Sequence, residues 1–106
     1  MALGEDKVRR MTAHEALHDS RATVMRLAAR HGASNVRVFG SVVRGEDGPD
    51  SDIDLLVDAG PEPSPFFPGG LVADLEDLLG RRVHVVTEAA LHWYIRDRVL
   101  REAAPL

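Results

Sequence analysis

The chain has 106 residues, of which 44% are hydrophobic and 28% charged, and this length allows one domain with one hydrophobic core. It has no cysteine, which excludes a disulfide framework, a thiol nucleophile and a zinc–thiolate site. Its net charge of −4 disfavours direct DNA binding, which needs a basic face, and no apolar run approaches membrane-spanning length. We therefore expect a single domain over residues 1–106, located in the cytoplasm, with no membrane contact and no direct binding to DNA.

A helix followed by a strand is predicted in the first part of the chain. Thr12 and Glu15 have the spacing of a capping box, in which a hydroxyl and a carboxylate satisfy amide groups at a helix start. Gly32 is placed to end this helix. Its apolar stripe is formed by Ala13, Leu17, Val24, Leu27 and Ala28. The β-branched and aromatic residues 36–39 then predict a strand, which ends at a turn.

A second strand is predicted between two segments of turn and loop composition. Residues 45–51 are polar and rich in glycine, which is typical of a turn. The apolar residues 53–57 form the strand. The proline-rich residues 59–70 follow, and we interpret them as a loop that is either a lid or a connector.

The last third of the chain predicts a helix, a strand and a second helix. Apolar residues recur at helical spacing from Leu71 to Leu79, and Gly80 is placed to end that helix. Residues 83–86 form a third short strand, and Thr87 is a suitable N-cap for the final helix. The order helix, strand, strand, helix, strand, helix indicates an α/β (α+β) domain.

Two aspartates on the second strand predict a metal site. Side chains alternate along a strand, so Asp52 and Asp54 point the same way, about 7 Å apart, while Ile53 points to the opposite face. Two carboxylates so close repel each other unless a cation lies between them. Magnesium prefers carboxylate oxygens and commonly completes its shell with water and substrate phosphates. The natural third component is a nucleoside triphosphate.

A glycine–serine turn at the end of the first strand adds phosphate-binding groups. Gly40 lets the backbone approach a phosphate closely, and the Ser41 hydroxyl and the following amides can donate to it. If Ser41 opens a short helical turn, the start of that turn also favours an anion. Arg44 either adds a cationic phosphate contact or is a surface arginine beside the acidic Glu46 and Asp47.

Each motif also has a plainer interpretation. An Asp-x-Asp strand is often a solvated outer face, and Gly-Ser is a common turn dipeptide. Their joint occurrence, with ten residues between Ser41 and Asp52, favours a catalytic site.

The combination resembles the signature of the polymerase-beta-like nucleotidyltransferases. Ser41 to Gly45 (SVVRG) and Ser51 to Val57 (SDIDLLV) are similar to the minimal branch of that family, and the likeness spans roughly residues 20–106. The resemblance implies the nucleotidyltransferase fold, a small mixed β-sheet with helices packed on one face. It further implies that Asp52 and Asp54 bind Mg²⁺, or Mn²⁺, and that the Gly-Ser turn holds the triphosphate of ATP.

The same resemblance implies a partner protein. Members of the minimal branch commonly act as antitoxins beside a HEPN-domain ribonuclease toxin, and some transfer AMP from ATP to a toxin tyrosine. We expect this role here.

His84 departs from the family pattern, which has a third carboxylate on the next strand. The chain reads Val83-His84-Val85-Val86 there. A neutral histidine can accept a proton from an attacking hydroxyl, but imidazole is a poorer ligand for magnesium than for zinc or manganese. We therefore expect His84 to be a metal ligand or the general base, or else the activity to be weakened or lost.

Other aromatic and histidine residues carry less information. Trp93 and Tyr94 lie beside the apolar stripe of the last helix, and we interpret them as residues that pack in the core or against a partner rather than as nucleotide stackers. The remaining histidines show no ligand spacing with a carboxylate pair, and no chemistry is assigned to His14, His18, His31 and His92.

Three functions are compatible with the sequence. The leading hypothesis is a metal-dependent nucleotidyltransferase that modifies a toxin. The alternative is a catalytically impaired antitoxin of the same fold that neutralises its toxin by binding it. The third is a nucleotide sensor, which would bind ATP tightly without forming a product.

Overall fold

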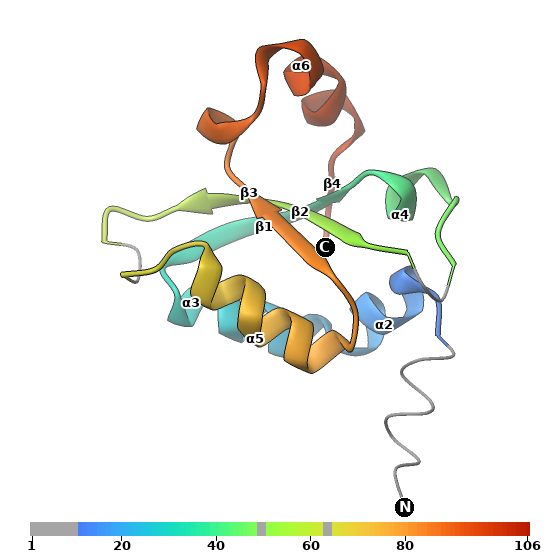
Figure 1. The fold of residues 1–106 in the computed structure, drawn as a ribbon, viewed down its shortest axis with the longest axis horizontal. Helices are drawn as coiled ribbons and strands as arrows, with labels where there is room; N and C mark the ends of the chain where they lie inside the picture. The colour runs from blue at the N-terminus through green and yellow to red at the C-terminus, as the bar shows by residue number, and fades with distance from the viewer. Residues whose placement is uncertain (1–10, 49–50, 63–64) are drawn as a thin grey trace, which may run out of the picture.

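The computed structural model describes residues 11–48, 51–62 and 65–106. A four-stranded sheet with the order β3-β2-β1-β4 forms its centre (Figure 1). Its strands are β1 (Ala33–Phe39), β2 (Ile53–Ala59), β3 (Val83–Val86) and β4 (Ala104–Pro105). β1 pairs antiparallel with β2 and β4, whereas β2 pairs parallel with β3. The sheet is therefore mixed, as expected.

Most of the helices cover one face of this sheet. They are α2 (Ala13–Asp19), α3 (Arg21–Arg30) and α5 (Gly69–Leu79), and Figure 1 shows all three on the same side. The short 3₁₀ helix η1 (Glu88–Ala90) is followed by α6 (Trp93–Glu102), which lies on the other side of the sheet. None of the helices in residues 11–48, 51–62 and 65–106 combines the length and apolar character needed to cross a membrane.

Side chains of β2 alternate between the main core face of the sheet and the opposite face, which carries both Asp54 and the buried Leu56. Ile53, Leu55 and Val57 are at most 1% exposed and belong to the main hydrophobic cluster, together with apolar residues of α3 and α5. Asp54 and Leu56 point to the other face, because neighbouring residues of a strand face opposite ways. Burying one leucine of this kind stabilises the fold by roughly 1.5–3 kcal/mol, so this alternation fixes which face carries the aspartates.

The first helical segment is two helices rather than the single one predicted. The capping box is present, with the Glu15 amide donating to Thr12 Oγ1 at 3.1 Å and the Thr12 amide donating to Glu15 Oε1 at 3.4 Å. The chain leaves helical geometry at Ser20 (φ −103°, ψ 11°) and resumes in α3. Val24 and Ala28 remain buried beyond the break. One distorted residue does not change the apolar period, so the pattern could not reveal it.

The C-terminal region differs most from the predictions. Thr87 precedes η1 only, and α6 begins at Trp93 after His92, whose Nδ1 accepts the Tyr94 amide at 3.1 Å. Packing of Trp93 and Tyr94 in the core is wrong, because the two residues are 78% and 77% exposed, and a partner contact stays a prediction. Both lie in the first turn of a helix that begins later than predicted, and this places them off its buried face.

The predicted loop over residues 59–70 is shorter in the structure. β2 continues to Ala59 and α5 already starts at Gly69. Residues 63 and 64 of this segment lie outside the described residues.

Candidate active site

The turn after β1 requires glycine at position 40. Gly40 has φ +79° and ψ −149°, a conformation that residues with a Cβ rarely adopt. A Cβ built on it would collide with the Asp54 carboxylate. Gly40 is the N-cap of the four-residue helix α4 (Ser41–Arg44), so the short helical turn considered from the sequence is present.

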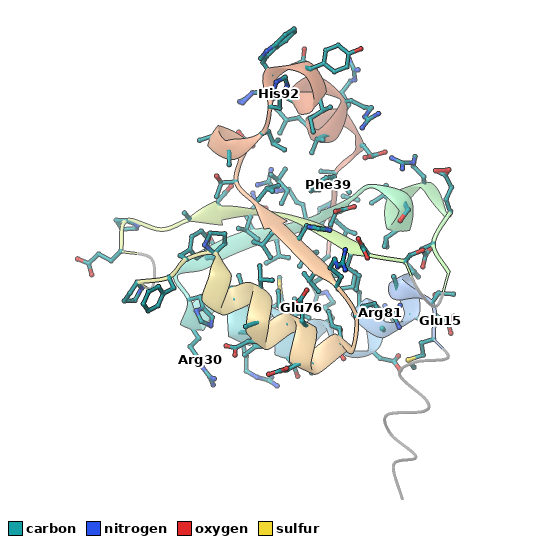
Figure 2. The ribbon with its side chains drawn as sticks, in the orientation of Figure 1. Glu15, Arg30, Phe39, Glu76, Arg81 and His92 are labelled. Atoms are coloured by element: carbon teal, nitrogen blue, oxygen red, sulfur yellow. The ribbon has the colours of Figure 1, made fainter. Side chains whose placement is uncertain are left out.

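The strand register brings the predicted site residues together. Phe39 is the cross-strand partner of Asp54 in the antiparallel pair, and Asp54 is the partner of His84 in the parallel pair. Cross-strand partners point to the same face of a sheet. Phe39, Asp54 and His84 therefore lie side by side on one face of the sheet. Figure 2 shows Phe39 on the face toward α6.

Asp52 completes this group just before β2 begins. His84 Nε2 lies 3.2 Å from Asp52 Oδ2, and the two side chains are 50% and 45% exposed. The histidine is thus next to both aspartates, at the place where the family pattern puts a third carboxylate. The structure groups Asp52, Asp54 and His84 beside the turn at Gly40.

The electrostatics of Asp54 favour a nearby cation. Partial burial is the largest influence and raises the pKa of Asp54, and the negative charges of Asp52 and Glu102 raise this pKa further. His84 and Arg44 oppose the shift. An ionised Asp54 is therefore held at an electrostatic cost that a bound cation would offset.

The donor set fits a metal ion that is shared with a substrate. Within the parts of the chain that the structure describes, no three His, Asp or Glu side chains are gathered as a ready-made metal site. Magnesium is nevertheless commonly held by one or two carboxylates together with substrate phosphates and water. Asp52 and Asp54 supply that number of carboxylates, so they suit a nucleotide-bound Mg²⁺ rather than an all-protein cage.

Arg44 is the last residue of α4 and is already paired. Its Nη1 lies 2.7 Å from Glu102 Oε1, and its Nε contacts Glu46. The side chain is 45% exposed. Hydrogen bonds from Arg44 to the two carboxylates raise its pKa, so the guanidinium is held in its charged form. The structure therefore confirms that Arg44 is a surface arginine beside Glu46. A contact between Arg44 and a phosphate stays a prediction.

Glu102 is a site residue that the sequence reasoning missed. It is the last residue of α6, and its Oε2 accepts the Gly40 amide at 2.9 Å. Its position 62 residues along the chain from Gly40 hides the contact from any local pattern. The sequence held one signal for Glu102. A carboxylate at the C-terminal end of a helix is disfavoured by the helix dipole, so its presence there suggests a role other than stabilising the helix.

Comparison with known proteins agrees with this geometry. The model of the family described as Nucleotidyltransferase domain matches residues 23–105. A protein of Methanocaldococcus jannaschii named, provisionally, protein adenylyltransferase MJ0435 is 33% identical over 87 residues, covering 82% of this chain and 94% of that protein. Protein adenylyltransferase MntA of Thermococcus cleftensis is 46% identical over 76 residues, covering 72% and 77%.

Solved structures show the same fold. One, provisionally described as a minimal nucleotidyltransferase, superposes with a TM-score of 0.76 at 49% identity, over 88% of this chain and 95% of that chain. A second, described as a toxin-antitoxin crystal structure with AMP-PNP, gives a TM-score of 0.67 at 20% identity over 79% and 69%, a likeness of fold alone. The family match over most of the chain and the arrangement of its carboxylates together show that this protein belongs to the nucleotidyltransferase family.

Proposed function

We propose that this protein is a metal-dependent protein adenylyltransferase that acts as an antitoxin. It would transfer AMP from ATP to a tyrosine hydroxyl of a cognate HEPN-domain ribonuclease toxin. The observation that carries the proposal is the grouping of Asp52, Asp54 and His84 on one sheet face beside Gly40. The names of the two relatives support AMP transfer to a protein, and the toxin-antitoxin description of the second structure supports the kind of partner.

The proposed reaction assigns a role to each part of the site. The acceptor oxygen forms a bond to the α-phosphorus of ATP, the bond from that phosphorus to the bridging oxygen breaks, and pyrophosphate leaves while the hydroxyl proton is released. Asp52 and Asp54 hold Mg²⁺ or Mn²⁺, which supplies neutralisation of the phosphate charge. The Gly40 backbone and the Ser41 hydroxyl bind the triphosphate.

Arg44 supplies a cation beside the same turn. Its ion pairs within the described residues use Nε and Nη1, so Nη2 remains for a phosphate oxygen. Glu46 and Glu102 orient the guanidinium, which reduces the side-chain entropy lost when a phosphate binds.

His84 takes the position of the third carboxylate. From there it serves either as a metal ligand or as the group that accepts the hydroxyl proton. Its contact with Asp52 at 3.2 Å orients the ring in both cases.

A label-transfer experiment tests the proposal. The protein is incubated with ATP labelled at the α-phosphate, with Mg²⁺ or Mn²⁺, and with a purified candidate HEPN-domain toxin. We expect label on a toxin tyrosine with the wild type and none with Asp52→Ala or Asp54→Ala. Absence of transfer by the wild type with either metal would overturn catalysis.

A second candidate function is neutralisation by binding alone. Trp93 and Tyr94 are exposed, and Trp93 stacks on His92 with ring centroids 5.6 Å apart, which provides an aromatic contact surface. If this function is the correct one, Asp52→Ala and Asp54→Ala still protect cells from the toxin. Variants that still form the complex with the toxin but no longer protect cells would exclude neutralisation by binding alone. Tight ATP binding with no product from any acceptor would indicate a sensor.

The cellular location and the extent of the domain remain predictions. The absence of cysteine is compatible with a reducing cytoplasm, where a ribonuclease toxin would also act. Cell fractionation with an antibody against the protein checks the location.

A further inference from the structure

We infer that Glu102 is a positioning residue for the nucleotide: it fixes the turn at Gly40 and the guanidinium of Arg44 in the geometry that receives the triphosphate. This inference rests on the proposed function, which it extends to a residue outside the Gly-Ser and Asp-x-Asp motifs.

One carboxylate holds both ends of α4. Oε2 of Glu102 accepts the amide of Gly40, the N-cap, at 2.9 Å, and Oε1 lies 2.7 Å from Nη1 of Arg44, the last residue of the helix. The Glu102 side chain is 13% exposed. A helix of four residues has few internal hydrogen bonds and is not stable by itself, so its orientation depends on contacts of this kind.

The contact also compensates for the unusual backbone of Gly40. Gly40 is buried at φ +79°, with the Asp54 carboxylate against its Cα. Its amide would lose a hydrogen-bond partner without Glu102, and a buried amide without a partner is costly. A hydrogen bond to a charged carboxylate is about twice as strong as one between neutral groups. Gly40 is thus held between Glu102, on the amide side, and Asp54, one of the proposed metal ligands.

The anchor itself stands on a rigid part of the fold. Glu102 is followed by Ala103 and then by β4, which pairs with β1 at Arg37 and Val38. This pairing fixes the end of α6 to the same strand that leads into Gly40. A positioning residue is effective when its own backbone is fixed in this way.

Glu102 is suited to the role because it stays ionised. Burial acts to raise its pKa, but the hydrogen bonds from Gly40 and Arg44, with the charges of Arg44 and Arg98, outweigh burial and lower the pKa. At neutral pH the carboxylate therefore accepts from both donors.

The test compares three variants: Glu102→Ala, Glu102→Gln and the control Glu88→Ala. Glu88 is an acidic residue that also joins α6 to β1, through Arg96 and Arg37, but it does not contact Gly40. Measured quantities are kcat and KM for ATP in the transfer reaction, binding of a fluorescent ATP analogue with Mg²⁺, and hydrogen exchange of the Gly40 amide. The melting temperature of each variant is recorded as a check on folding.

We expect Glu102→Ala to raise KM for ATP about tenfold or more, with kcat within about threefold of wild type, since a hydrogen bond to a charged group contributes about 1.5–3 kcal/mol. Its Gly40 amide should exchange faster. Glu102→Gln should show a smaller rise, because the amide oxygen still accepts from Gly40 while the ion pair with Arg44 is lost. Glu88→Ala should keep the KM of the wild type.

The outcomes separate this inference from the proposed function. A wild type that neither binds nor transfers the nucleotide overturns both. A wild type that transfers AMP, with Glu102→Gln and Glu102→Ala at unchanged KM, overturns the positioning role alone, even if their melting temperatures fall. Should the alanine variant fail to fold, the KM of Glu102→Gln against that of Glu88→Ala decides the question.

Discussion

Gly40 meets two requirements that no other residue type satisfies. Its φ of +79° is strained for any residue with a Cβ, and the space where a Cβ would stand is taken by the carboxylate of Asp54. The close approach places the Gly-Ser turn against one of the two proposed metal ligands. At this position, backbone conformation and site geometry depend on the same missing side chain.

Replacing Gly40 by alanine therefore affects both stability and binding. We expect Gly40→Ala to lower the free energy of unfolding by about 1–3 kcal/mol from backbone strain and to weaken ATP binding by displacing Asp54. Gly48→Ala is the matched control, because a Cβ there meets nothing within 4 Å. Urea denaturation and nucleotide titration measure the two effects, and equal stabilities of the two variants would contradict the expectation.

Variants of His84 test directly what a histidine does at the position where the family has a third carboxylate. Because it touches Asp52 and pairs with Asp54, we expect His84→Ala to lower kcat about 100-fold, the size of a typical general acid–base contribution. His84→Asp restores the family pattern and should retain activity with Mg²⁺. Rates for both variants with Mg²⁺ and Mn²⁺ are the measurement. An unchanged rate in His84→Ala would show that the ring has no part in the chemistry.

At the scale of elements, helices pack on both faces of the sheet that carries the site. α5 packs its buried leucines, Leu71, Leu75 and Leu79, on the core face of the sheet. On the other face, η1 is tied to the strands by Glu88, which lies 3.2 Å from Arg37 of β1. β2 runs between these layers, so packing on the core side fixes the direction of Asp54 on the other.

A cavity in α5 should loosen the core without removing any site residue. Leu75 is 1% exposed, and we expect Leu75→Ala to cost about 2–5 kcal/mol of unfolding free energy. The exposed Asp77 lies on the same helix, and Asp77→Ala should stay within about 0.5 kcal/mol of wild type. Chemical denaturation provides the comparison. Similar losses in both variants would mean that Leu75 is not part of the core that the structure shows.

For the whole molecule, the candidate active site and the aromatic cluster of His92, Trp93 and Tyr94 lie at different ends of α6. Glu102, at the end of this helix, contacts Gly40, whereas His92 precedes its start, on the side of the sheet opposite α5 (Figure 2). The rings contact one another, with centroids 5.6 Å and 5.7 Å apart. Exposed tryptophan and tyrosine side chains are enriched among residues that dominate protein interfaces.

This separation predicts that binding of the proposed toxin and binding of the nucleotide can be changed independently. The double variant Trp93→Ala and Tyr94→Ala should weaken the toxin complex about tenfold or more, because such residues commonly contribute 2 kcal/mol or more. Binding of free ATP by this variant and its melting temperature should both stay near the wild-type values. Asp97→Ala, an exposed change on the same helix, is the control. An unchanged dissociation constant would place the toxin surface elsewhere.

The sequence by itself determined the class of fold and the strand face on which Asp54 lies. The α/β class, the third strand at Val83–Val86 and the end of α5 at Gly80 are confirmed. So is the placement of Asp54 opposite the core, because the two-residue period of a strand and the burial of Ile53 and Leu55 are local properties.

Only the tertiary structure decided how distant segments meet. The two-residue strand β4 has too little pattern to be recognised, yet its pairing with β1 sets the end of α6. Glu102 contacts Gly40, which lies 62 residues away in the chain. The exposure of Trp93 follows from where α6 begins and from which of its faces packs on the sheet. These contacts depend on packing between elements far apart in the chain. Such packing leaves no periodic pattern in the sequence near either of the contacting residues.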